Sequence, residues 1–120
     1  MGKTWKFKFG MPDRIALVTL LQQGRGSYAE QKLAEKLCED MLSKADRANF
    51  NLRTEGNQIL WDTVGKDGKL LQVEKELEFG PEARDMIIRN LAMLDEAHEL
   101  ERMYMGVYER FILTPWPDPT

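Results

Sequence analysis

The stretch Gln22–Glu30, QQGRGSYAE, marks the boundary between two helices. Its two glycines end a helix that we predict over residues 13–22, because glycine loses more backbone freedom in a helix than any other residue. Its serine and the glutamate three residues later have the spacing of a capping box, in which each side chain binds the backbone amide of the other residue. The stretch therefore predicts a second helix that begins at Tyr28, and its glycines need no ligand to explain them.

On the N-terminal side, residues 5–9 (WKFKF) alternate between apolar and basic side chains, which predicts a short strand with one buried face. Within the second helix, apolar residues recur every four positions from 33 to 41, so this helix presents an apolar stripe to a core. A serine and an aspartate with cap spacing then predict a short helical turn over residues 43–49.

On the C-terminal side, turn clusters at residues 55–57 and 66–69 separate short apolar segments, which predicts two or three small antiparallel strands. Residues 73–79 (VEKELEF) have the pattern of a strand with one acidic face. The glycine–proline pair that follows begins a clear helix. We predict that Asp95 caps a last helix, whose apolar face extends to Phe111.

These elements predict a helix-rich α+β domain with a small antiparallel β-sheet and a C-terminal helical hairpin, because two helices joined by a short turn usually pack antiparallel. We expect residues 1–113 to form a single compact domain and residues 114–120 (TPWPDPT) to form an extended proline-rich tail. Trp116 in this tail either folds back onto the domain or is free.

Composition restricts the function. The chain has 120 residues, a net charge of −3 and one cysteine, so it cannot form an internal disulfide and fits a reducing cytoplasm. Its longest apolar run, residues 15–21, is far shorter than the ~20 residues that a membrane-spanning helix needs. No signal-peptide pattern follows the N-terminal lysines. We therefore expect a cytoplasmic protein without a membrane partner.

The candidate catalytic and metal-binding groups each have a simpler structural explanation. Asp95–His98 spells a helicase tetrapeptide, but the chain lacks the phosphate loop that such motors need. Its histidine is the only one, whereas transition-metal sites usually have several His or Cys ligands. Cys38 lies on the apolar stripe, and the glutamates of residues 74–82 fit the solvent-facing side of a strand and a helix start. We predict no catalytic residue, cofactor or metal, and therefore no enzyme.

Nucleic-acid binding is an alternative hypothesis. The order of helix, glycine turn, helix, short helical turn and hairpin is that of a winged helix-turn-helix, and Arg25, Arg47 and Arg53 would supply its contacts with nucleic acid. Residues 27–46, however, contain more acidic than basic side chains, which disfavours a helix that enters a DNA groove. Binding to a protein is therefore the preferred hypothesis.

Four runs of the sequence resemble a group of small hypothetical proteins from tailed phages, prophages and some bacteria. These runs are RIALVTLLQQG (14–24), EGNQILWD (55–62), KELEFGPEA (75–83) and VYERF (107–111). The resemblance spans most of residues 5–112 and implies a common fold without a known activity. Members of the group have a proline in the loop after the first helix, where this chain has residues 23–26 (QGRG). The resemblance favours a phage or prophage setting, in which small proteins often bind host or virion proteins.

The last predicted helix offers a candidate protein interface, because methionines and tyrosines that adapt to a partner are common at contact surfaces. The candidate residues are Met103, Tyr104, Met105, Tyr108 and, in the tail, Trp116. Their apolar side chains cover more than one narrow stripe, which suits either an interface, including one between two copies of the chain, or a helix buried on all sides. The sequence thus predicts a non-catalytic protein-interaction domain that is a candidate homodimer.

Overall fold

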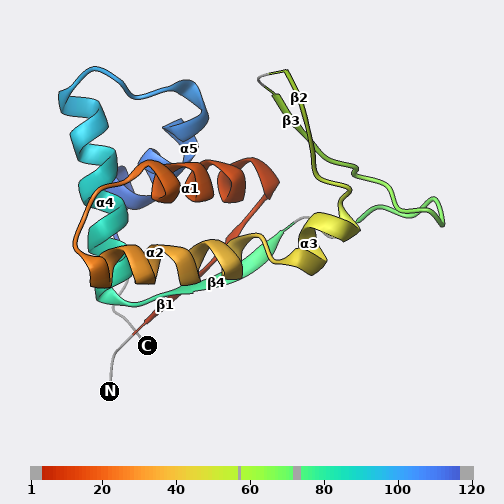
Figure 1. Ribbon diagram of the computed structural model, residues 1–120, viewed down its shortest axis with the longest axis horizontal. Coiled ribbons are helices and arrows are strands. Elements are labelled where there is room, and N and C mark those ends of the chain that lie inside the picture. The colour runs from red at the N-terminus through yellow and green to blue at the C-terminus, as the bar shows by residue number, and fades with distance from the viewer. Residues whose placement is uncertain (1–3, 57, 72–73, 117–120) are drawn as a thin grey trace.

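The computed structural model describes residues 4–56, 58–71 and 74–116, and it confirms the predicted helix-rich α+β class (Figure 1). Its strands and helices follow one another along the chain in the order β1 (Trp5–Phe9), α1 (Met11–Gln23), α2 (Tyr28–Met41), α3 (Lys44–Asn49), β2 (Arg53–Glu55), β3 (Gln58–Leu60), β4 (Lys75–Phe79), α4 (Pro81–Glu96), the 3-10 turn η1 (Arg102–Tyr104), α5 (Met105–Tyr108) and the π-helical turn η2 (Glu109–Leu113).

The first and the fourth strand form an antiparallel ribbon that connects distant parts of the chain. Their register pairs Trp5 with Phe79 and Phe9 with Lys75. The apolar side chains Trp5, Phe9, Leu77 and Phe79 are buried, whereas the lysines of β1 and the glutamates of β4 are exposed. The alternation predicted for both strands is confirmed, but their pairing with each other was not predicted.

Both strands of the ribbon lead directly into a helix through a glycine. Gly10 and Gly80 have extended backbone angles and occupy the N-cap positions of α1 and α4, and a proline follows in the first turn of each helix. Proline suits this position because the amide that it lacks would have no helical partner there. The core lies between α1, α2, α4 and the ribbon, with Leu17, Ile87 and Phe111 almost completely buried.

Two capping boxes define the starts of α2 and α3. The Ser27 hydroxyl accepts a hydrogen bond from the Glu30 amide, and the Glu30 carboxylate accepts one from the Ser27 amide. Ser43 and Asp46 make the same reciprocal pair at the start of α3. The predicted helix starts at both positions are therefore confirmed, because a capping box depends only on residues three apart in the sequence.

The start of the last helical segment was predicted wrongly. Asp95 does not cap a new helix, because α4 continues to Glu96. His98 then has a left-handed backbone with φ of 57°, its amide donates to the Asp95 carbonyl oxygen at 3.1 Å, and the Glu99 amide donates to the Leu94 carbonyl oxygen at 2.8 Å. These two bonds form a Schellman motif, which ends α4 and moves the next helical turn to Arg102.

The segment after α4 returns to the body, and the start of the tail packs with it. Trp116 donates from Nε1 to the Phe111 carbonyl oxygen at 2.8 Å, and its ring packs against those of Trp5 and Phe7 with centroid distances of 5.1 and 5.0 Å. Of the two positions predicted for Trp116, the structure has the folded one. The rest of the predicted extended tail, residues 117–120, lies outside the described residues.

The predicted small antiparallel sheet is divided into two separate pairs of strands among the described residues: β1 with β4, and β2 with β3. The segment around Leu70, predicted as a further strand, makes a single antiparallel bridge with Val64. The predicted turn residue Asn57 and the predicted strand residue Val73 lie outside the described residues.

Candidate binding surfaces

A double hairpin, residues 51–71, projects from the helical body after α3 (Figure 1), and we call it the arm. Its first hairpin is the β2–β3 pair, with Gly56 in a left-handed conformation at the turn. Its second hairpin turns at Gly68, where φ is 80°, and the Gly65 amide donates to the Lys69 carbonyl oxygen at 2.8 Å. Glycine is favoured at such turns because it adopts this backbone conformation without the strain that a side chain causes.

The base of the arm is fixed to the body. The Asp62 amide donates to the Phe50 carbonyl oxygen at 2.7 Å, and the Asp62 carboxylate pairs with Arg53 at 3.0 Å. Leu52, Trp61 and Leu71 are half-buried and pack against the core. The arm therefore projects from a defined base rather than from a loose loop.

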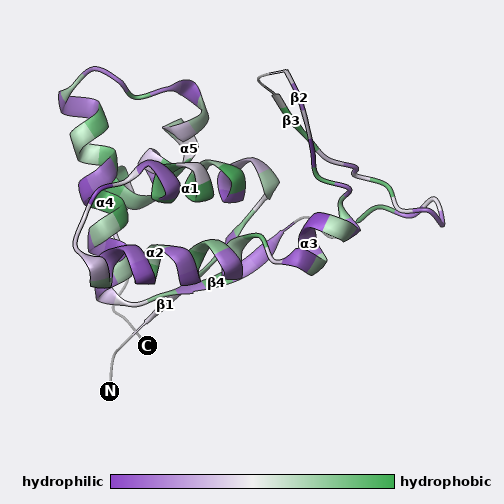
Figure 2. Ribbon diagram, viewed as in Figure 1, coloured by the Kyte–Doolittle hydropathy of each residue, from purple (hydrophilic) through white to green (hydrophobic). Residues whose placement is uncertain are grey.

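Beyond this base, apolar side chains of the arm face solvent. Ile59, Val64 and Leu70 have exposed fractions of 37, 46 and 83%, and the apolar colouring of Figure 2 follows β3 out along the arm. These residues were not predicted as a binding surface, because short apolar segments between turns were interpreted as strands that pair in a sheet. The sequence does contain one indication that these side chains are exposed: such short strands cannot bury three apolar side chains unless a second layer covers them.

The predicted C-terminal interface is divided between surface and core. Met103 and Met105 are 40 and 51% exposed, whereas Tyr104 is only 2% exposed. Tyr108 is partly buried, and its hydroxyl donates to an Asp95 carboxylate oxygen at 3.0 Å. Trp116 belongs to the aromatic cluster of β1. Tyr104 is thus a core residue, and of the five residues predicted for this interface only the two methionines have broadly exposed apolar side chains.

The three arginines predicted for nucleic-acid contact come from separate parts of the fold. Arg25 precedes the start of α2 and Arg47 follows its end, and a helix of this length spans about 21 Å. Arg53 lies at the base of the arm and pairs with Asp62. The structure therefore does not bring them together as one compact basic patch. In the N-terminal strand, Lys6 and Lys8 face Glu78 and Glu76 across the ribbon.

Arg14, a further basic residue of the N-terminal part, is inside the protein with an exposed fraction of 1%. Its Nη2 donates to Asp46 Oδ2 at 2.7 Å, and its Nε donates to the Met41 carbonyl oxygen at 2.8 Å. Lys75 of β4 contacts the same Asp46 oxygen at 2.9 Å. Partial burial raises the pKa of Asp46, but the bonds from Lys75 and the Ser43 amide and the charge of Arg14 outweigh it, so that this pKa is lower than usual. The cluster is structural because it joins α1, α3 and β4.

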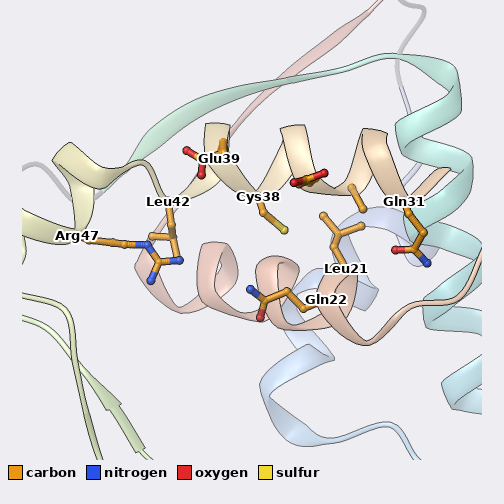
Figure 3. Close-up of a pocket in the computed structure, with 9 residues that line it drawn as sticks. Leu21, Gln22, Gln31, Cys38, Glu39, Leu42 and Arg47 are labelled. Carbon is orange, nitrogen blue, oxygen red and sulfur yellow. The ribbon is translucent and has the colours of Figure 1, made fainter. Parts of the chain in front are cut away.

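A cleft of about 400 Å³ lies between α1, α2 and α3, and Cys38 points into it from α2 (Figure 3). The thiol is half-buried and donates to the Val18 carbonyl oxygen at 3.9 Å. Burial raises the pKa of Cys38, and the positive charge of Arg47 opposes this shift only partly. The thiol is therefore protonated at neutral pH, and its geometry agrees with the packed thiol predicted from the apolar stripe.

The remaining candidate groups are dispersed. The single histidine is exposed at the end of α4, where its backbone conformation ends the helix. Within the described ranges, no three His, Cys, Asp or Glu side chains are placed to hold a metal ion. No helix in the same part of the chain combines the length and the apolar character needed to cross a membrane.

Comparisons with protein-family models, with curated proteins and with solved structures gave no match to this chain.

Proposed function

We propose that this chain is a non-catalytic protein-interaction domain that binds its partner through the arm. The observation that carries the proposal is Leu70, which is 83% exposed at a defined turn and is accompanied by Val64 and Ile59 on the same projection. Burying a leucine side chain stabilises a complex by about 1.5–3 kcal/mol, whereas leaving it in water contributes nothing to the fold. The bridge between Val64 and Leu70 places two of these exposed apolar side chains beside each other, and apolar side chains that gather on an exposed surface mark interaction sites.

The resemblance to small proteins of tailed phages and prophages supports a phage setting for this role, with a host or virion protein as the partner. A second copy of the chain is the other partner that the proposal includes. Nucleic-acid binding has weaker support, because Arg14 and Arg53 are paired with carboxylates and Arg25 is separated from Arg47 by α2.

The test uses photocrosslinking from two leucine positions of similar exposure. A photoreactive phenylalanine derivative at position 70 on the arm is compared with the same residue at position 113, where Leu113 is 65% exposed on the C-terminal segment. We expect a discrete crosslinked product from position 70 and little from position 113. A product of twice the chain mass identifies self-association, and a different mass identifies another protein.

Two results would contradict the proposal. Crosslinking from position 113 alone would move the interface to the C-terminal segment with Met103 and Met105. Equal diffuse labelling from both positions would show that neither surface binds specifically. With the photoreactive residue kept at position 70, the substitution Val64→Asp should abolish the product without a large drop of the thermal midpoint, because Val64 is 46% exposed beside position 70 and makes a limited contribution to folding.

A further inference from the structure

A groove runs between α2 and the edge of β4 that does not pair with β1, and we call it the β4 groove. It consists of two adjoining hollows of about 640 and 330 Å³ that share Leu37, Asp40 and Glu78 as lining residues. The residues that line it do not include any residue of the arm. Figure 1 shows α2 and β4 running alongside each other, in agreement with their contacts.

The groove opens onto the backbone of the strand. Both inward-facing residues of β4, Leu77 and Phe79, and its outward-facing residues, Glu76 and Glu78, contribute to the lining. Side chains from both faces of a strand can border the same hollow only along an edge. Among the described residues, no second strand pairs with β4 on this side. An unpaired edge of this kind is a template for an additional strand.

The charges around the groove are mostly negative. Its lining includes the carboxylates Glu39, Asp40, Glu76, Glu78 and Glu82. Of the two lysines that also line it, Lys75 is held by Asp46 at 2.9 Å and by the Asp40 carbonyl oxygen at 2.7 Å. Lys36 is exposed. The rim therefore favours a basic ligand.

The chain itself shows which sequence pairs with β4. On its other edge, the WKFKF segment places Lys6 and Lys8 opposite Glu78 and Glu76, while its Trp5 and Phe9 face the core. A third strand with the same alternation would place its basic side chains beside Glu76 and Glu78. The Thr4 hydroxyl, which also lines the groove, donates to Glu78 Oε1 at 2.7 Å, and the second carboxylate oxygen of Glu78 can accept from a basic side chain. The apolar side chains of the third strand would then lie toward α2, where Leu33 and Leu37 line the groove.

We propose that the β4 groove binds an extended peptide segment of a partner protein in which lysine or arginine alternates with apolar residues, as a third strand beside β4. The five residues of β4 span about 16 Å, which fits a segment of five or six residues. Two copies of the chain would not pair through this edge, because β4 beside β4 places glutamates against glutamates. The proposal does not depend on the arm.

The test uses the full chain and a synthetic peptide with the sequence of residues 4–10, TWKFKFG, against a control peptide TWEFEFG. We expect fluorescence anisotropy to show binding of the lysine peptide that weakens as salt is raised, and no binding of the glutamate peptide. Two further versions of the lysine peptide carry N-methyl groups on alternate amides, so that each version lacks the hydrogen-bond donors of one strand edge. The version methylated on the edge that faces β4 should lose binding. Equal binding of the two parent peptides, or unchanged binding of both methylated peptides, would overturn the proposal.

Charge variants test whether the lysine peptide binds in the β4 groove. Glu82→Lys reverses an exposed charge at the rim, outside the ribbon, and should raise the Kd of the lysine peptide by about three- to ten-fold. Glu35→Lys makes the same change on α2 among residues that do not line the groove and should change the Kd less than about two-fold. Similar effects of the two variants would overturn the assignment to this groove.

Hydrogen exchange separates addition of a strand from replacement of β1. Bound peptide should protect amides of Lys75–Phe79, and amides of Trp5–Phe9 should keep their protection. Loss of protection in β1 would mean that the peptide displaces the native strand, and a sedimentation mass that grows with protein concentration would assign the groove to a second copy of the chain. Either result would overturn the proposal.

Discussion

The substitution Asp46→Asn isolates the contribution of one charge to the stability of the fold, because it keeps the size of the side chain and removes its negative charge. Asp46 Oδ2 contacts the guanidinium of Arg14 at 2.7 Å and the ammonium of Lys75 at 2.9 Å. Arg14 is only 1% exposed, whereas Lys75 is 36% exposed at its side chain. After the substitution, Lys75 can turn to water, but the charge of Arg14 stays inside the protein and loses the carboxylate of Asp46.

We expect this variant to lose about 3 kcal/mol of unfolding free energy, because the buried guanidinium loses the negative charge that it contacts at 2.7 Å. For 120 residues, an unfolding entropy of about 0.25 kcal/mol/K converts that loss into a thermal midpoint lower by about 12 °C. Urea unfolding followed by circular dichroism measures the free energy, and calorimetry measures the midpoint.

Asp62→Asn is the matched control. It removes the same charge from another aspartate–arginine pair, at 3.0 Å, in which both side chains are about 40% exposed. Exposed pairs of this kind contribute about 0–1 kcal/mol. If the two variants lose the same free energy within about 0.5 kcal/mol, then the burial of Arg14 does not control the effect, and the reasoning is wrong.

The double variant Arg14→Met/Asp46→Asn provides a second check on the same argument. It removes the buried charge together with its partner, so it should be more stable than Asp46→Asn alone, although the Met41 carbonyl oxygen loses a donor. A double variant that is less stable than the single variant would show that the hydrogen bonds and packing of Arg14, rather than its charge, dominate.

The pKa of Asp46 is lower in the folded than in the unfolded chain, so the contribution of its charge to stability is complete above about pH 3.9 and is lost as the pH falls through the folded pKa. Below about pH 4, the unfolding free energy of Asp46→Asn should therefore change less with pH than that of the unsubstituted chain. His98→Gly should raise the unfolding free energy by about 0.5–1 kcal/mol, because glycine adopts the left-handed conformation without strain, and unchanged stability in urea would contradict this. Trp116→Ala should lower it by about 2 kcal/mol through lost packing on Trp5, Phe7 and Phe111, and a change below about 0.5 kcal/mol would show that the tail does not pack in solution.

Much of the local structure could be predicted because its causes lie within a few residues. Ser27 and Ser43 are followed by acidic residues three positions later, and both pairs form capping boxes in the structure. The period-two alternation of residues 5–9 likewise predicts a strand without reference to its partner. Such patterns report the local conformation directly, since hydrogen bonds and side-chain direction are fixed by sequence spacing.

Contacts between distant segments could not be predicted in the same way. Asp46 was recognised as a helix-cap residue, but neither Arg14 nor Lys75 could be assigned to it from spacing along the chain. Spacing along the chain likewise gives no sign that the lysines of β1 and the glutamates of β4 are neighbours. The register of the ribbon places these residues opposite each other, so each strand compensates the charge of the other.

The error at Asp95 has a different physical origin. Aspartate favours the N-cap position, but an acidic residue in a continuing helix has the same local sequence. The backbone of His98 decides between the two outcomes, and its left-handed conformation carries only a weak sequence signal because histidine is less common there than glycine or asparagine. The later helical start in turn buries Tyr104 and leaves the methionines on either side of it exposed.

The size of the arm limits what it can contribute to binding. Complete burial of Ile59, Val64 and Leu70 would yield at most about 2.5–5 kcal/mol, because Ile59 and Val64 are already more than half covered. Association itself costs about 4–15 kcal/mol, so the apolar side chains alone support only weak binding. A tight complex would therefore need additional contacts, and the β4 groove lies on the same chain. If one partner occupied both surfaces, binding at the first would raise the effective concentration at the second, so that two weak sites would act as one strong one.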